Sequence, residues 1–132
     1  MSEFTLEIVT PDRKFFEDQV EMVIVRGIEG DIGILKNHIP LVTPLDIGRI
    51  KITQAGKVRE AALAGGYIEV SKEKATIITD SAEWPEEIDI ERAMEAKKRA
   101  EERLKKRESI DTVRAEIALR KALNRINVAQ KK

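Results

Sequence analysis

The chain has 132 residues, with 24 acidic and 24 basic side chains and no cysteine. This length suits one compact domain with an appendage better than two full-sized cores. The lack of cysteine excludes disulfides and thiol nucleophiles, and a single histidine, His38, excludes a metal site built on paired histidines. No apolar run approaches the roughly 20 residues of a membrane span, and the first residues lack the features of a secretory signal, so we expect a soluble chain without membrane insertion.

Glycine, proline and charge divide the chain into two parts. All seven glycines and all four prolines lie before Glu86. Residues 1–85 carry 10 basic and 14 acidic side chains, whereas residues 86–132 carry 14 and 10. We therefore predict two domains of opposite net charge, residues 1–84 and residues 85–132.

The first part is predicted to consist of β-strands. Several short runs combine β-branched side chains with alternation of apolar and polar positions, and two pairs of them flank short turns as hairpins do. The runs are residues 4–10, 20–26, 50–53, 58–61, 67–70 and 75–79. Strands that recur about every ten residues, without a helical pattern between them, predict an antiparallel β-sandwich or barrel.

Three glycines, Gly27, Gly30 and Gly33, have a spacing that could suggest a phosphate-binding loop. Such a loop needs a following helix whose N-terminus faces the anion, whereas this stretch continues toward Pro40 and Pro44. We therefore interpret these glycines as structural.

The second part is predicted to be an antiparallel pair of helices. The residues from 86 to about 107, and those from about 112 to 129, each place small apolar side chains three or four positions apart. Asp89 would cap the first helix, and Ser109 or Asp111 the second. An alanine-rich seam buries little apolar area, so the pair is either a marginally stable moving element or a static cap on the strands.

Cations gather at the open end of this hairpin. Arg92 and Arg99 are seven residues apart, hence on one face and about 10 Å apart along the axis. If the chain reverses near Ser109, Arg92 lies opposite Arg125, with Lys121 one turn along. An anion such as a polyphosphate would stabilise this arrangement, and the alternative is an ordinary solvated charged face.

Four segments resemble one known family. Residues 30–45, Gly-Asp-Ile-Gly-Ile-Leu-Lys-Asn-His-Ile-Pro-Leu-Val-Thr-Pro-Leu, are similar to the central motif of the epsilon subunit of bacterial F-type ATP synthases. Residues 10–12, 64–70 and 122–129 follow in the order of that family, so the resemblance covers the whole chain. In one departure, Lys36-Asn37 replaces the Pro-Gly turn common before the histidine.

The resemblance implies a non-catalytic regulatory subunit, with no enzyme activity of its own. Its β-sandwich would dock on the gamma subunit and the c-ring of the rotor. Its hairpin would be either folded or extended along gamma into the catalytic alpha/beta hexamer, where the extended form inhibits ATP hydrolysis. Such a subunit is peripheral, at the cytoplasmic face of the bacterial cell membrane.

The resemblance also implies site residues and a ligand. Residues 88–93 are similar to the short nucleotide-binding motif of the family, so ATP is expected as a regulatory ligand that is not hydrolysed, with or without magnesium. Lys121 stands where nucleotide-binding relatives tend to have arginine. A lysine ammonium keeps the positive charge but lacks the planar guanidinium that can donate two parallel hydrogen bonds to a phosphate. The implied nucleotide contacts are Glu83, Ile88, Asp89, Arg92, Ala93, Arg99, Lys121 and Arg125. The implied rotor-contact residues are Asp31 and His38, and the implied inhibitory contacts are Arg114, Arg120 and Lys121.

Two other classes of function are disfavoured by the residues themselves. A nucleic-acid binder is at odds with the sequence pI of 6.6 and with only five aromatic residues, which leave no stacking platform. A stand-alone enzyme is at odds with the lack of a nucleophile and base pair.

Overall fold

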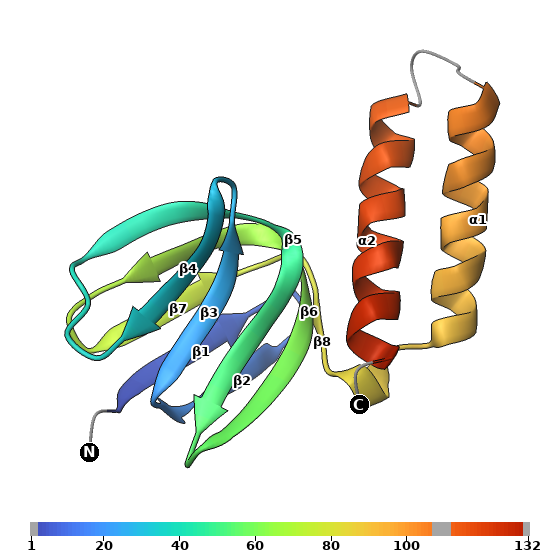
Figure 1. The fold of residues 1–132 in the computed structure, drawn as a ribbon. Helices are drawn as coiled ribbons and strands as arrows, with labels where there is room; N and C mark the ends of the chain where they lie inside the picture. The colour runs from blue at the N-terminus through green and yellow to red at the C-terminus, as the bar shows by residue number, and fades with distance from the viewer. Residues whose placement is uncertain (1–2, 107–111, 131–132) are drawn as a thin grey trace. The chain divides into compact units, whose positions relative to one another are not determined.

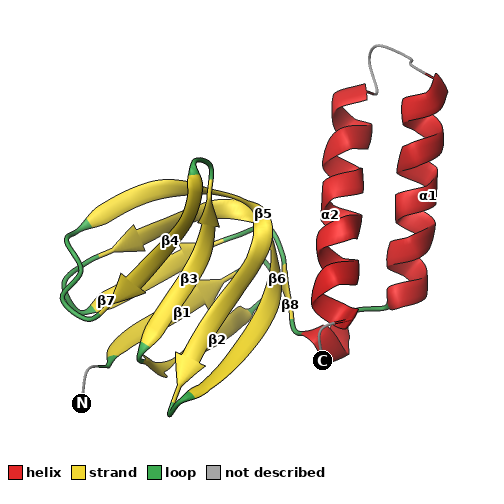
Figure 2. Ribbon diagram, viewed as in Figure 1, coloured by secondary structure: helices red, strands yellow, loops and turns green. Residues whose placement is uncertain are grey.

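The computed structural model describes residues 3–106 and 112–130, and it divides into two compact units, Met1–Glu83 and Trp84–Lys132. Strands make up the first unit and helices the second (Figures 1 and 2).

The first unit is a β-sandwich made from one continuous sheet. Its strands are β1 (Phe4–Val9), β2 (Lys14–Val20), β3 (Met22–Gly27), β4 (Gly30–Leu35), β5 (Leu41–Gln54), β6 (Lys57–Val70), β7 (Lys74–Ile78) and β8 (Ala82–Glu83). The hydrogen-bonded order is β2-β1-β7-β6-β5-β3-β4, with β8 added to β6. All neighbours are antiparallel except β1 and β7, which are parallel. The predicted β fold is confirmed, with this one parallel pair as a departure.

The long strands β5 and β6 bend so that one sheet forms both layers (Figure 1). Within β6, Gly65 and Gly66 both have positive φ angles. A Cβ atom at Gly66 would collide with the Ile78 carbonyl oxygen, so only glycine fits there. The two layers also meet where β2 ends: the Glu21 N–H donates to the Thr53 carbonyl at 2.8 Å.

The core lies between the layers and consists of aliphatic side chains. Along β1, β3 and β7 alternate residues are buried, as a half-buried strand requires. The largest fully buried side chains are Leu6, Ile8, Ile34, Ile50, Ile52, Ile68, Ile77, Val20, Val23 and Val25 in this unit.

Three strands, β2, β4 and the two-residue β8, were not predicted from the sequence, and one predicted run is divided. Strand β2 was missed because its exposed acidic residues interrupt the apolar pattern after Phe15 and Phe16. Strand β4 was missed because it begins at Gly30 and pairs with β3 alone at the end of the sheet. The run 20–26 belongs to two strands, since Val20 ends β2 and β3 begins at Met22.

The second unit is a helical hairpin preceded by a short turn. A 3-10 turn, η1 (Pro85–Glu87), leads to α1 (Ile90–Lys106), and α2 (Thr112–Gln130) runs antiparallel to α1 (Figure 1). The first helix therefore begins four residues later than the expected Glu86. The two residues expected to cap α2, Ser109 and Asp111, lie outside the described residues.

The seam between the helices is narrow, as the alanine pattern predicted. Ala93 and Ala100 of α1 are buried, as are Ala115 and Ala122 of α2. Small side chains allow the helices to approach closely but bury little area. At about 25 cal/mol per Å² of apolar surface, this seam stabilises the hairpin less than a leucine seam would.

Candidate functional site

The segment that leads into α1 is closed by backbone and side-chain hydrogen bonds. The Glu87 N–H donates to the Trp84 carbonyl at 2.9 Å, and the Trp84 N–H donates back to Glu87 Oε1 at 2.9 Å. The Ile88 N–H donates to the Pro85 carbonyl at 3.2 Å. Proline suits the first position of such a turn because its missing N–H would have no partner there.

Asp89 caps α1, as predicted. Its Oδ1 accepts the Arg92 N–H at 3.1 Å, and its carbonyl accepts the Ala93 N–H at 3.0 Å. This carboxylate therefore satisfies a backbone donor at the positive end of the helix. The side chains on either side of this cap, Ile88 and Ala93, are 8% and 3% exposed, so they present only their edges to a ligand.

The basic residues of α1 lie along one flank of the seam. Arg92, Arg99 and Arg103 recur at intervals of seven and four, next to the buried Ala93 and Ala100. All three arginines are exposed. Neither Arg92 nor Arg99 forms an ion pair with any described residue.

The basic residues of α2 lie along the matching flank. Arg114, Lys121 and Arg125 also recur at intervals of seven and four, beside the buried Ala115 and Ala122. In two antiparallel right-handed helices these two flanks fall on the same broad face of the hairpin. Because α2 ends where α1 begins, Arg125 is brought to the same end as Arg92 (Figure 1).

Three other expected residues do not lie at the end of the hairpin that holds Arg92 and Arg125. Glu83 is in β8 of the first unit, opposite Ala62 of β6. Arg114 is exposed near the start of α2, away from the capped end of α1. Arg120 is exposed in the middle of α2.

The two expected rotor-contact residues lie in and after β4. Asp31 pairs with Arg26 across β3 and β4, with 3.8 Å between Arg26 Nη1 and Asp31 Oδ1. His38 closes the turn after β4, since its N–H donates to the Leu35 carbonyl at 3.2 Å. Asn37 has a φ of 66° in this turn. Asparagine tolerates this left-handed region better than most residues, so it can stand here in place of glycine.

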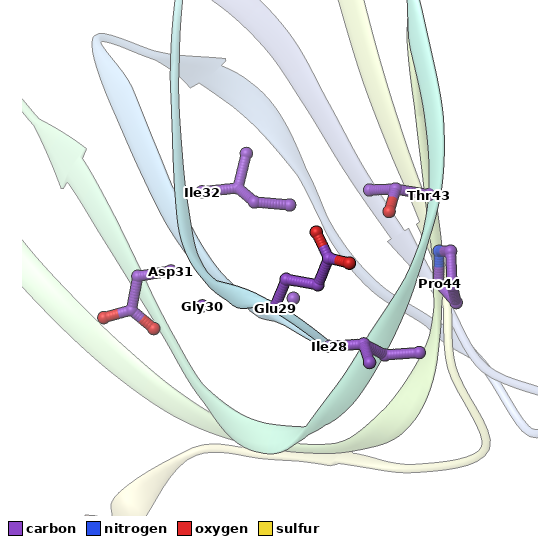
Figure 3. A pocket seen from close by; sticks show the side chains of 8 residues that line it. Ile28, Glu29, Gly30, Asp31, Ile32, Thr43 and Pro44 are labelled. Atoms are coloured by element: carbon purple, nitrogen blue, oxygen red, sulfur yellow. The ribbon is translucent and has the colours of Figure 1, made fainter.

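A hollow of about 500 Å³ lies beside Asp31, between the β3–β4 turn and the start of β5 (Figure 3). The Glu29 carboxylate and the Thr43 hydroxyl supply polar groups there, and Ile28 and Pro44 supply apolar ones (Figure 3). Its lining residues are Gly27, Ile28, Glu29, Gly30, Asp31, Ile32, Thr43 and Pro44.

The sequence reasoning missed this hollow and the role of Glu87. The hollow depends on the pairing of β3 with β4, which was not predicted. Glu87 carried a usable signal, because a proline at the first position and an acidic residue at the third are typical of a capped turn.

Two family models together match nearly the whole chain. Residues 3–85 match the ATP synthase, Delta/Epsilon chain, beta-sandwich domain, and residues 86–130 match the ATP synthase, Delta/Epsilon chain, long alpha-helix domain. The chain belongs to the ATP synthase delta/epsilon family.

Curated members of this delta/epsilon family are similar over their full length. The "ATP synthase epsilon chain" of Alkaliphilus metalliredigens is 58% identical over 132 residues, covering 99% of this chain and 98% of the relative. That of Caldicellulosiruptor bescii is 52% identical over 131 residues, covering 98% and 96%.

Solved structures of mitochondrial ATP synthases contain chains with the same fold. A chain in the cryo-EM structure of the Euglena gracilis mitochondrial ATP synthase, containing OSCP, F1 and the c-ring, superposes with a TM-score of 0.82 at 25% identity. The match covers 91% of this chain and 77% of that one. A chain of the central stalk and c-ring of the Tetrahymena thermophila mitochondrial enzyme, at 14% identity and a TM-score of 0.58, shares the fold.

Two features are absent from the described residues. Neither described helix combines the length and apolar character of a membrane-crossing segment. The same residues include no group of three or more acidic or histidine side chains placed to hold a metal ion.

Proposed function

We propose that this chain is a non-catalytic subunit of the central stalk of a bacterial F-type ATP synthase, bound peripherally at the cytoplasmic face of the membrane. Its membership of the delta/epsilon family supports this role, as do full-length relatives called ATP synthase epsilon chain. A structural neighbour from an assembly of F1 and c-ring adds further support. The gamma subunit, the c-ring and the alpha/beta hexamer are its partners in this proposal.

The β unit is the docking part. Near Asp31, the Ile28 side chain in the β3–β4 turn is 65% exposed, and next to His38 the Ile39 side chain is 78% exposed. Exposed large apolar side chains are typical of protein contacts. The segments around Asp31 and His38 are the regions that contact the rotor.

The helical unit binds ATP as a regulatory ligand that it does not hydrolyse, with or without magnesium. One observation carries this proposal: the capped start of α1 and the basic flanks of both helices share one end and one broad face. Arg92 and Arg99 are exposed and free of carboxylate partners among the described residues, so they are available to phosphate oxygens. The nucleotide would neutralise cations that otherwise repel one another across the seam.

The hairpin also inhibits ATP hydrolysis when it is extended. Its narrow alanine seam supports a moving role, because switch elements come from the less stable parts of a structure. ATP binds the folded form better than the extended form and so relieves the inhibition.

Isothermal titration of the full chain with ATP, GTP and a short DNA tests the ligand. We expect ATP to bind more tightly than GTP and DNA not to bind. Arg92→Ala should weaken ATP binding by about 1.5–3 kcal/mol, the range for losing a hydrogen bond to a charged group. Arg103→Ala is the matched control, since Arg103 lies on the same flank three turns away and should leave the affinity unchanged. Equal effects of the two substitutions would contradict the site.

A further inference from the structure

The connection between the two units is held on its β side up to Glu83. Strand β8 pairs with β6, with Ala82 opposite Leu63 and Glu83 opposite Ala62. Just before β8, the Ala64 N–H donates to the Ser81 carbonyl at 3.1 Å. The backbone through Glu83 therefore belongs to the sheet.

On the helical side the connection is held from Trp84 onward. The Glu87 carboxylate accepts the Trp84 N–H, while the Glu87 N–H donates to the Trp84 carbonyl, each at 2.9 Å. We call this reciprocal pair the Glu87 clasp. The turn that it closes packs against α2, and Asp89 caps α1 immediately afterwards. The backbone from Trp84 to α1 therefore belongs to the hairpin.

We propose that Glu87 is a positioning residue that makes the whole 84–89 connector part of the helical unit, so that the Glu83–Trp84 peptide is the hinge of the hairpin. When the clasp is closed, the backbone between the β8 pairing and the α1 cap can rotate at the Glu83–Trp84 junction and is held elsewhere. If the clasp opens, six residues become a flexible linker, and the stretch from Ile88 to Ala93 loses its fixed start.

This inference rests on the proposed function in one respect, which is that the stretch from Ile88 to Ala93 contacts ATP. When only a fraction of the molecules has an ordered site, the apparent affinity for the ligand equals the intrinsic affinity multiplied by that fraction. Closing the connector in advance thus raises the affinity for ATP without Glu87 touching the ligand.

Three variants of the full chain separate the clasp from general effects of charge. Glu87→Ala removes the acceptor, whereas Glu87→Gln keeps an oxygen at the same distance along the side chain and removes the charge. Glu86→Ala is the matched control, because it removes an acidic residue of the same turn that lies outside the clasp. Circular dichroism checks that each variant keeps its helices.

Two measurements apply to every variant: hydrogen exchange at the Trp84 amide by NMR, and the affinity for ATP by titration calorimetry. We expect Glu87→Ala to speed exchange at Trp84 at least ten-fold and to weaken ATP binding about ten-fold. Glu87→Gln should restore both within about three-fold, and Glu86→Ala should change neither.

Each alternative result has a definite meaning. Unchanged exchange at Trp84 in Glu87→Ala would overturn the clasp and, with it, the position of the hinge. Faster exchange with unchanged ATP affinity would overturn the positioning role. If the unaltered chain does not bind ATP, the nucleotide part of the proposed function fails, while the exchange rates still decide whether Glu87 fixes the connector.

Discussion

The carboxylate of Asp89 accepts a hydrogen bond from the backbone N–H of Arg92 at 3.1 Å. Both residues belong to the stretch that resembles a nucleotide-binding motif. The same contact starts a helix and fixes the backbone from which the Arg92 side chain extends. Under the proposed function, helix capping and nucleotide binding would therefore depend on one carboxylate, and we expect substitutions at Asp89 to affect both.

Asp89→Ala should lower the stability of the helical unit by about 1 kcal/mol, the usual cost of losing an N-cap. It should also abolish the relief of inhibition by ATP while leaving the inhibition itself intact. Asp89→Asn retains a capping oxygen and should melt like the unaltered chain by circular dichroism. If Asp89→Ala melts at the same temperature as Asp89→Asn, the observed hydrogen bond does not stabilise α1.

Truncation after Glu83 should leave a folded β unit that still assembles with the gamma subunit. In the part of the chain that the structure describes, all eight strands and the aliphatic core of the sandwich lie upstream of this point. We expect an unchanged strand signal by circular dichroism and copurification with gamma. An unfolded fragment would show that the hairpin supplies part of the core.

Local patterns carried most of the predictable structure. The hairpin between β5 and β6 was predicted because a glycine-containing turn separates two alternating runs, and the alanine seam because its spacing follows the helical period. The Asp89 cap was predicted because aspartate before an apolar-periodic run marks a helix start.

Long-range relationships were not predictable from such patterns. Alternation along β1 shows which side chains face the core, but not that β1 pairs in parallel with β7, about 70 residues away. Strand β4 has two glycines and a single neighbour, so the pairing with β3 rather than its own propensity makes it a strand. The basic flanks of α1 and α2 lie on one face because the two helices pack antiparallel. Before the structure, only the resemblance and the helical period suggested this packing.

The turn between β5 and β6 contains a strained residue. Ala55 has a φ of 48° and Gly56 a φ of 77°, the signs of a type I′ turn, in which asparagine precedes glycine most favourably. Ala55→Asn should therefore stabilise the chain by about 0.5–1 kcal/mol, because alanine is disfavoured in the left-handed region. Urea unfolding should show a higher midpoint at an unchanged m value. Gly56→Ala, the opposite change in the same turn, should lower the midpoint.

Glu7 joins three strands through ion pairs. Its two carboxylate oxygens lie 3.0 Å from Lys74 Nζ on β7 and 3.4 Å from Lys14 Nζ on β2. The hydrogen bond from Lys74 lowers the pKa of Glu7 below its usual value. A lowered pKa means that the folded state favours the ionised form, so this stabilisation is present above the unfolded pKa of about 4.3 and is lost as the pH falls through the folded value.

Glu7→Gln should therefore lower the melting temperature at pH 7, and the difference from the unaltered chain should shrink as the pH falls below about 4. Glu17→Gln is the control, because among the described residues Glu17 forms an ion pair only with Lys14, and its side chain is more exposed than that of Glu7. It should have the smaller effect. A Glu7→Gln difference that stays constant from pH 7 to pH 3 would exclude the ion pairs as its cause.

The basic residues of α2 provide the test of inhibition. Arg114 and Arg120 are exposed and Lys121 is half-buried, so the folded hairpin does not need their charges for its core. In the extended form we expect these cations to contact acidic parts of the catalytic hexamer. Neutralising all three with glutamine should therefore weaken inhibition of hydrolysis in the reconstituted complex.

The dependence on ATP distinguishes this effect from the nucleotide switch. Removing the cations weakens the contact made by the extended form, so hydrolysis should rise at every ATP concentration, whereas Asp89→Ala should leave inhibition in place and remove only its response to ATP. Neutralising Lys97, Lys98 and Lys105 of α1 removes the same charge and should leave inhibition unchanged. If the α1 and α2 variants relieve inhibition equally, net charge and not a specific contact of α2 is responsible.

Fluorescence transfer between a dye on the β unit and one on α2 should fall when ATP is withdrawn. Hydrolysis that responds to ATP at a constant dye distance would assign the regulation to the catalytic subunits instead.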